Sequence, residues 1–85
     1  MKIIFAPSAM DDLGYWQKTG NTAILKRIRL LLQSIQDDPY NGIGKPEPLK
    51  HDRSGYWSRR INKEHRIVYQ VIDDTINVLQ VRYHY

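Results

Sequence analysis

The chain has 85 residues, no cysteine, a formal net charge of +4 and a pI near 9.5. Its hydrophobic content of 41% is enough for one small core, and the lack of cysteine excludes disulfides and thiolate metal ligands. We therefore expect one domain over residues 1–85, in a reducing cytoplasm, with an acidic partner such as nucleic acid or an acidic protein.

The chain opens with a predicted strand and helix. Residues 2–6 are β-prone, and Pro7 ends the run. This apolar run is too short for a signal-peptide core or a membrane span, so no membrane partner is expected. Ser8 is the predicted N-cap of a first helix that runs to about Lys18.

A second helix, expected over about residues 22–36 behind a cap at Asn21, has the clearest periodicity in the chain. Its apolar residues recur at helical spacing along one stripe, formed by Ile24, Ile28, Leu31 and Ile35. Such a stripe predicts a helix that packs against a core. The short connection predicts an antiparallel hairpin with the first helix.

The second half predicts a stiff loop followed by sheet. Residues 39–48 hold three prolines and two glycines, which favour a loop. Strands are expected at about 56–62, 65–72 and 75–83, with a hairpin turn at 73–74. The predicted class is α+β in the order β-α-α-β-β-β. One antiparallel sheet would carry the helical hairpin on one face and polar groups on the uncovered face.

The stretch from Lys45 to Arg66 has seven Lys or Arg against three acidic residues, with two histidines and two large aromatics interleaved. Such a patch suits a polyanion whose bases stack on aromatic rings. One of its acids, Glu47, lies between Pro46 and Pro48, which limit its backbone freedom. A carboxylate fixed at this position would repel a phosphate backbone, so its presence is better explained if it takes part in a reaction there. The alternative is a solvated basic face that happens to include a glutamate.

Three residues could together cleave a phosphodiester through an internal hydroxyl. That reaction needs a base, a cation for the developing charge and an acid for the leaving oxygen, which Glu47, Arg66 and His84 could supply. Their spacing does not show that they converge. Arg66 could instead pair with Glu64 or Asp52, and His84 could be a frayed terminal residue. No HExxH, clustered acids or phosphate-binding glycine motif is present, so no metal or cofactor is expected.

Five segments resemble one family of bacterial proteins. They are DDLGYWQ (11–17), GKPEPLKH (44–51), GYWSRRI (55–61), EHRIVYQV (64–71) and RYHY (82–85). These long ungapped motifs resemble the YoeB/Txe family of toxins, within the RelE superfamily of ribosome-dependent mRNA interferases. The resemblance implies a type II toxin-antitoxin toxin with a microbial-ribonuclease (RelE-like) fold, which cleaves mRNA in the ribosomal A site. Its partners would be mRNA, the ribosome and a neutralising YefM-type antitoxin, and a homodimer is left open.

The family motif also implies roles for seven residues. Glu47 in KPEP corresponds to the general base, Arg66 in EHR to the transition-state cation and His84 to the general acid. Tyr85 corresponds to the terminal aromatic of the site. Phosphate and substrate contacts fall on three further positions, Lys50, His51 and Arg60.

One difficulty concerns strand register. With a two-residue turn at 73–74, Arg66 would lie opposite Val81, and alternation would then place His84 on the other face of the sheet. A longer loop, a bulge or a terminal segment that leaves the sheet would each remove the difficulty.

Two other classes of function would use the same basic patch. One is a non-catalytic RNA- or ribosome-binding module, and the other is a protein-interaction module that accepts an acidic segment. Glu47 favours a nuclease over a pure binder, because a binder of phosphate gains nothing from a carboxylate there.

Overall fold

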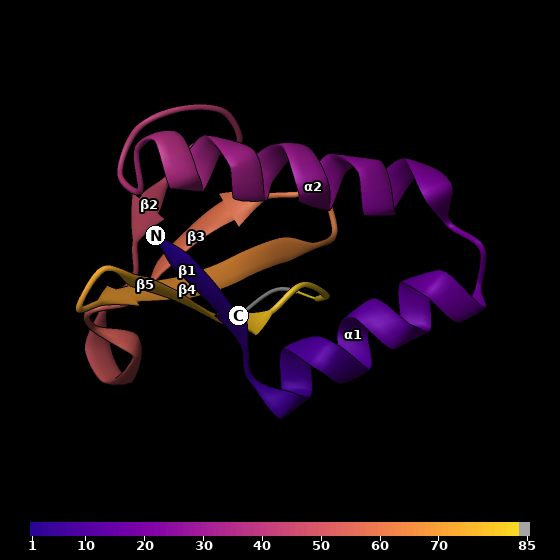
Figure 1. Ribbon diagram of the computed structural model, residues 1–85, viewed down its shortest axis with the longest axis horizontal. Coiled ribbons are helices and arrows are strands. Elements are labelled where there is room, and N and C mark those ends of the chain that lie inside the picture. The colour runs from indigo at the N-terminus through magenta and orange to yellow at the C-terminus, as the bar shows by residue number, and fades with distance from the viewer. Residues whose placement is uncertain (84–85) are drawn as a thin grey trace.

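The computed structural model describes residues 1–83, which form two helices and one five-stranded sheet with the strand order β1-β5-β4-β3-β2 (Figure 1). The elements are β1 (Lys2–Phe5), α1 (Pro7–Lys18), α2 (Thr22–Asp37), β2 (Glu47–Pro48), the 3₁₀ turn η1 (His51–Arg53), β3 (Trp57–Arg60), β4 (Arg66–Ile72) and β5 (Thr75–Gln80). The α+β class is confirmed, and the predicted order of helices and strands is found with one additional short strand, β2. Neither helix is long and apolar enough to cross a membrane.

The sheet is mixed, so the prediction of a purely antiparallel sheet is wrong in one place. β1 runs parallel to β5, from Lys2 opposite Thr75 to Phe5 opposite Val78. Tight turns force neighbouring strands to be antiparallel, but β1 reaches the sheet through a helical hairpin that imposes no such restriction. Residues 47–48, expected in a loop, form the edge strand β2 against β3. A proline is tolerated at such an edge.

The two helices begin in different ways. The predicted Ser8 cap is wrong, because α1 starts at Pro7 with Ala6 as its cap residue. Proline suits the first turn of a helix, where its missing N–H has no partner to lose. The Ser8 hydroxyl instead donates to the carbonyl of Leu79, at 2.6 Å. The Asn21 cap of α2 is confirmed, since its side chain accepts from the backbone N–H of Ile24.

The predicted apolar stripe of α2 is core. Three of its residues, Ile28, Leu31 and Ile35, are at most 2% exposed, and Ile24 packs against them. The sheet contributes a second set of buried side chains, which are Ile67, Tyr69, Ile76, Val78 and Val81. Figure 1 shows α1 and α2 as an antiparallel pair joined by a short connection, as the sequence predicted.

The face of the sheet away from α2 is not open at its centre, contrary to expectation. Ser58 and Val68 point to this face by strand alternation, yet both are fully buried. Leu49, in the segment between β2 and η1, is also only 7% exposed. A side chain added at Gly55 would lie 3.3 Å from the amide nitrogen of Gln70. Polar groups are therefore displaced towards the edge at β2 and the start of β4.

A β-bulge changes the register that the turn alone predicted. Tyr69 pairs with Val78 but Val68 pairs with Gln80, so Leu79 is an extra residue on β5. One extra residue reverses the alternation beyond it. Consequently the backbone N–H of Arg66 donates to the carbonyl of Tyr83, at 3.0 Å, and Arg66 does not pair with Val81 as the turn alone predicted. The bulge is found, and β5 also ends at Gln80, before the last residues, while His84 itself lies outside the described residues.

Candidate active site

The structure brings Glu47 and Arg66 together across three strands. Glu47 pairs with Ser58 of β3, and Arg66 pairs with Arg60 of the same strand. Because positions 58 and 60 are two residues apart, all four side chains leave the same face. The Glu47 Oε1 atom lies 3.9 Å from Arg66 Nη1. The predicted convergence of these two residues is therefore present.

The pair is an electrostatic contact and not a short hydrogen bond. At 3.9 Å the two groups attract each other but are too far apart for a strong hydrogen bond. The Glu47 side chain is 49% exposed and the Arg66 side chain only 15%. Glu47 therefore keeps lone pairs open to an incoming group, while its position relative to the cation is restrained.

Arg60 adds a second cation to this face. It lies directly opposite Arg66 in the β3–β4 ladder and is exposed. Like charges at opposite positions in a sheet repel each other, and an anion bound between them would relieve the repulsion. The substrate contact that the sequence motif implied for Arg60 stays a prediction.

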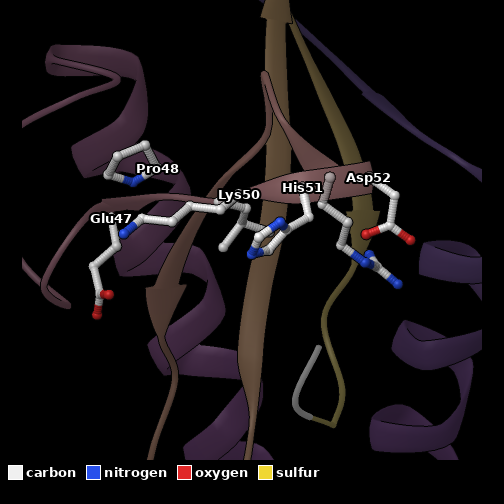
Figure 2. A pocket seen from close by; sticks show the side chains of 7 residues that line it. Glu47, Pro48, Lys50, His51 and Asp52 are labelled. Atoms are coloured by element: carbon white, nitrogen blue, oxygen red, sulfur yellow. The ribbon is translucent and has the colours of Figure 1, made fainter.

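A pocket of about 370 Å³ begins at Glu47 and continues along the chain to Arg53. Figure 2 shows the side chains of Glu47, Lys50, His51 and Asp52 along its wall. Lys50 and His51 are exposed, and His51 has a left-handed backbone with φ of +61° where the chain enters η1. The predicted contacts Lys50 and His51 therefore line the same cavity as Glu47.

Arg59 is a structural residue that the sequence analysis missed. Its guanidinium is completely buried and donates to the Ser34 hydroxyl and the carbonyls of Asp38, Asn41 and Ile43, at 2.6–3.1 Å. Its Nε atom donates to the Tyr69 hydroxyl, at 3.2 Å. A usable signal was present, because two adjacent arginines on a strand must face opposite sides.

The Arg59 guanidinium thus ties the loop after α2 to the helix and the sheet. The same loop is fastened at its far end, where the N–H of Arg60 donates to the carbonyl of Gly44, at 2.7 Å. Gly44 has φ of +82°, and a side chain there would lie 2.7 Å from Leu31. Only glycine fits this close approach without strain. These contacts therefore fix the backbone of the loop that leads to Glu47.

The ionisable groups with shifted pKa values surround the site but do not belong to it. Burial raises the pKa of Asp12, against a hydrogen bond from the Val81 N–H that lowers it. Burial likewise raises the pKa of the Tyr69 hydroxyl beside Arg59. Hydrogen bonds from the backbone N–H of Tyr40 and the side chain of Asn41 lower the pKa of Asp38. Asp38 and Tyr69 both belong to the network around the loop.

Two of the predicted site residues, His84 and Tyr85, lie outside the described residues. The chain before them reaches the site, because the carbonyl of Tyr83 accepts from the N–H of Arg66. Within residues 1–83, no three His, Cys, Asp or Glu side chains gather as they would around a metal ion.

Known proteins match this chain over its whole length. The model of a family described as the YoeB-like toxin of bacterial type II toxin-antitoxin systems matches residues 5–85. Toxin YoeB of Escherichia coli K12 is 49% identical over 85 residues, which is all of both chains. The solved YoeB/ParE toxin from Agrobacterium tumefaciens is 44% identical and superimposes with a TM-score of 0.96 over all of both chains.

The Staphylococcus aureus relative has been solved in two assemblies. In a YoeB–YefM complex it is 46% identical with a TM-score of 0.90, and in a YoeB dimer 45% identical with a TM-score of 0.91. Each match covers 100% of this chain and 98% of the other. With one family model across residues 5–85 and relatives of nearly half identity along the full length, this chain belongs to the family of YoeB-like toxins of bacterial type II toxin-antitoxin systems.

Proposed function

We propose that residues 1–85 act as one metal-independent endoribonuclease domain that cleaves mRNA in the ribosomal A site and so inhibits translation. The observation that carries the proposal is the Glu47–Arg66 pair at the pocket edge, 3.9 Å apart, with Arg60 opposite Arg66. A surface that served only to bind phosphate would not place a half-exposed carboxylate beside its cations.

The chemistry uses the 2′-hydroxyl of the substrate as the nucleophile. Glu47 takes the proton of that hydroxyl, and the hydroxyl oxygen then attacks the adjacent phosphorus. Arg66 stabilises the negative charge that builds up on the phosphate oxygens. The bond from phosphorus to the 5′ oxygen then breaks, and His84 gives that oxygen a proton. The products are a 2′,3′-cyclic phosphate and a free 5′-hydroxyl.

The other motif positions would bind and orient the RNA. Lys50, His51 and Arg60 contact backbone phosphates along the pocket, and the Tyr85 ring stacks on a base. The half-exposed Glu47 and the shallow edge of the sheet give little enclosure, so alignment for in-line attack would come from the ribosome. Such an activity places the protein in the cytoplasm, where ribosomes translate.

A YefM-type antitoxin is the proposed inhibitor. The S. aureus relative forms a complex with YefM, and the basic surface around Arg60 and Arg66 suits an acidic segment of such a partner. The dimer of the same relative supports a homodimer of this chain as a second assembly. Analytical ultracentrifugation with and without the antitoxin distinguishes these assemblies.

The decisive experiment modifies the substrate. Ribosomes are programmed with mRNA that carries one 2′-deoxy nucleotide immediately 5′ of the scissile bond, and cleavage is read by primer extension. The proposal expects cleavage of the unmodified mRNA and none at the modified position, with binding little changed because phosphate contacts dominate affinity. Cleavage at the deoxy position would overturn the internal-hydroxyl mechanism. Protection without any cleavage would support the non-catalytic binding module instead.

A further inference from the structure

The segment 81–83 is tied down unusually well for the end of a chain. The N–H of Val81 donates to Asp12 Oδ2, at 3.0 Å, and its carbonyl accepts from Trp16 Nε1, at 2.9 Å. The N–H of Tyr83 donates to His65 Nδ1, at 2.8 Å, and its carbonyl accepts from the N–H of Arg66, at 3.0 Å. Chain ends usually fray, and ordering one takes specific contacts. Here both backbone polar groups of residues 81 and 83 are bonded to the body of the protein.

Tyr83 has a strained backbone three residues after the end of β5. Its φ is +67°, in the left-handed region that residues other than glycine seldom occupy. Such a conformation persists only where the surroundings hold it. His65 and Arg66, adjacent in sequence, hold the N–H and the carbonyl of this residue, one each. These two bonds therefore hold the backbone of Tyr83 in this conformation.

The His65 ring is itself oriented by α1. It packs edge-on against the ring of Trp16, with centroids 4.8 Å apart and an interplanar angle of 79°, and Trp16 is only 5% exposed. At the residue before Trp16, the Tyr15 ring carries the Arg82 guanidinium, which lies 3.4 Å from its centre. Positions 12, 15 and 16 lie on one side of α1, so this helix surface contacts both Val81 and Arg82.

We propose that His65 is a positioning residue for the reaction assigned above. Its Nδ1 lone pair holds Tyr83 in the left-handed conformation, and Tyr83 is the residue that precedes His84 and Tyr85 in the chain. The inference rests on the proposed function, in which those two residues act on the substrate. His65 is not a catalytic residue, because its ring faces Trp16 and its Nδ1 atom is occupied by the Tyr83 N–H.

Two substitutions separate the hydrogen bond from the ring packing. His65→Phe keeps a ring against Trp16 but removes the acceptor. His65→Asn loses the ring but can place its amide oxygen where Nδ1 lies. Thr19→Val serves as a control, because it removes side-chain hydrogen bonds to the carbonyls of Tyr15 and Trp16 at the end of α1 but removes no bond to the terminal segment itself.

The first measurement does not depend on RNA cleavage. Amide hydrogen exchange of Tyr83 is expected to be about fivefold faster in His65→Phe, the change expected from losing one hydrogen bond, and near parental in His65→Asn and Thr19→Val. The second is single-turnover cleavage on programmed ribosomes. His65→Phe should lower the rate by a similar or larger factor with ribosome affinity unchanged, and His65→Asn should restore it.

Either of two results overturns the inference: parental exchange and cleavage in His65→Phe, or equal losses in His65→Phe and His65→Asn. A His84→Ala variant measured in parallel keeps the two proposals apart. If His84→Ala cleaves like the parent, the proposed role of His84 fails, whereas the exchange rates still decide whether His65 holds Tyr83.

Discussion

Replacing Arg59 by methionine should strongly destabilise the protein, although this arginine has no role in the proposed chemistry. Methionine preserves an unbranched side chain of similar length and removes all the donors. The buried guanidinium makes bonds to the Ser34 and Tyr69 hydroxyls and to the carbonyls of Asp38, Asn41 and Ile43. Loss of this cation leaves those acceptors facing a side chain that cannot donate.

The size of the effect follows from the number of bonds and their burial. A hydrogen bond to a charged group contributes about 1.5–3 kcal/mol, but the five bonds share one guanidinium and their losses do not add. A buried acceptor left without its donor costs about 1–3 kcal/mol, and because several acceptors lose their shared donor we expect a loss of about 3–5 kcal/mol in total. For a domain of this size, 1 kcal/mol corresponds to roughly 4–8 °C in Tm. The Tm of Arg59→Met should therefore lie at least about 12 °C below that of the parent.

Arg60 provides the matched control, since it is the adjacent arginine on the same strand and is exposed. Arg60→Met makes the same chemical change, and at a surface position the expected effect on stability is within about 0.5 kcal/mol. Urea unfolding followed by circular dichroism measures both variants. If Arg59→Met unfolds within about 1 kcal/mol of Arg60→Met, the loop is not held by Arg59 and the reasoning is refuted.

Three further predictions concern the site and its surroundings. Three substitutions in the proposed machinery should each lower cleavage on ribosomes by about 10²–10⁴-fold while the fold persists: Glu47→Gln, Arg66→Ala and His84→Ala. Parental rates in all three would contradict the site. Asp12→Asn should be neutral or stabilising at pH 7, because the amide oxygen still accepts from Val81 and the desolvated charge is gone. The pKa of Asp12 is raised, so its stability contribution is complete below the unfolded value near pH 3.8 and is lost as pH rises through the folded pKa. Urea unfolding should therefore give free energies of unfolding for the parent and Asp12→Asn that converge at low pH. A difference that stays constant with pH would count against burial as the cause of the raised pKa. Asp38→Ala should instead lower the free energy of unfolding at pH 7. The lowered pKa of Asp38 means that its contribution is present at pH 7 and is lost as pH falls through the folded pKa, so equal stability of parent and variant at pH 7 would disprove it.

Local physical chemistry explains what the sequence alone could predict. The apolar stripe of α2 and its Asn21 cap depend on residues within a few positions of one another, and both are found. The turn at 73–74 is also local, and both of its residues have left-handed backbones, as a two-residue hairpin turn requires. The long motifs around Glu47 and Arg66 were sufficient for the family, because contiguous similarity needs no knowledge of contacts.

Pairings between distant residues were decided only by the tertiary structure. The parallel placement of β1 and the bulge at Leu79 depend on which edge and which register bury the most side chains, and no local pattern states either. The same limit applies to the adjacent arginines of β3. Strand alternation requires that one faces α2 and the other the site, but only the packing of the sheet decides that Arg59 is buried against Ser34 while Arg60 lies opposite Arg66. The Glu47–Arg66 contact likewise exists because β2 and β4 flank β3 on its two sides, and non-local strand pairing is the part of a fold that a linear pattern does not encode.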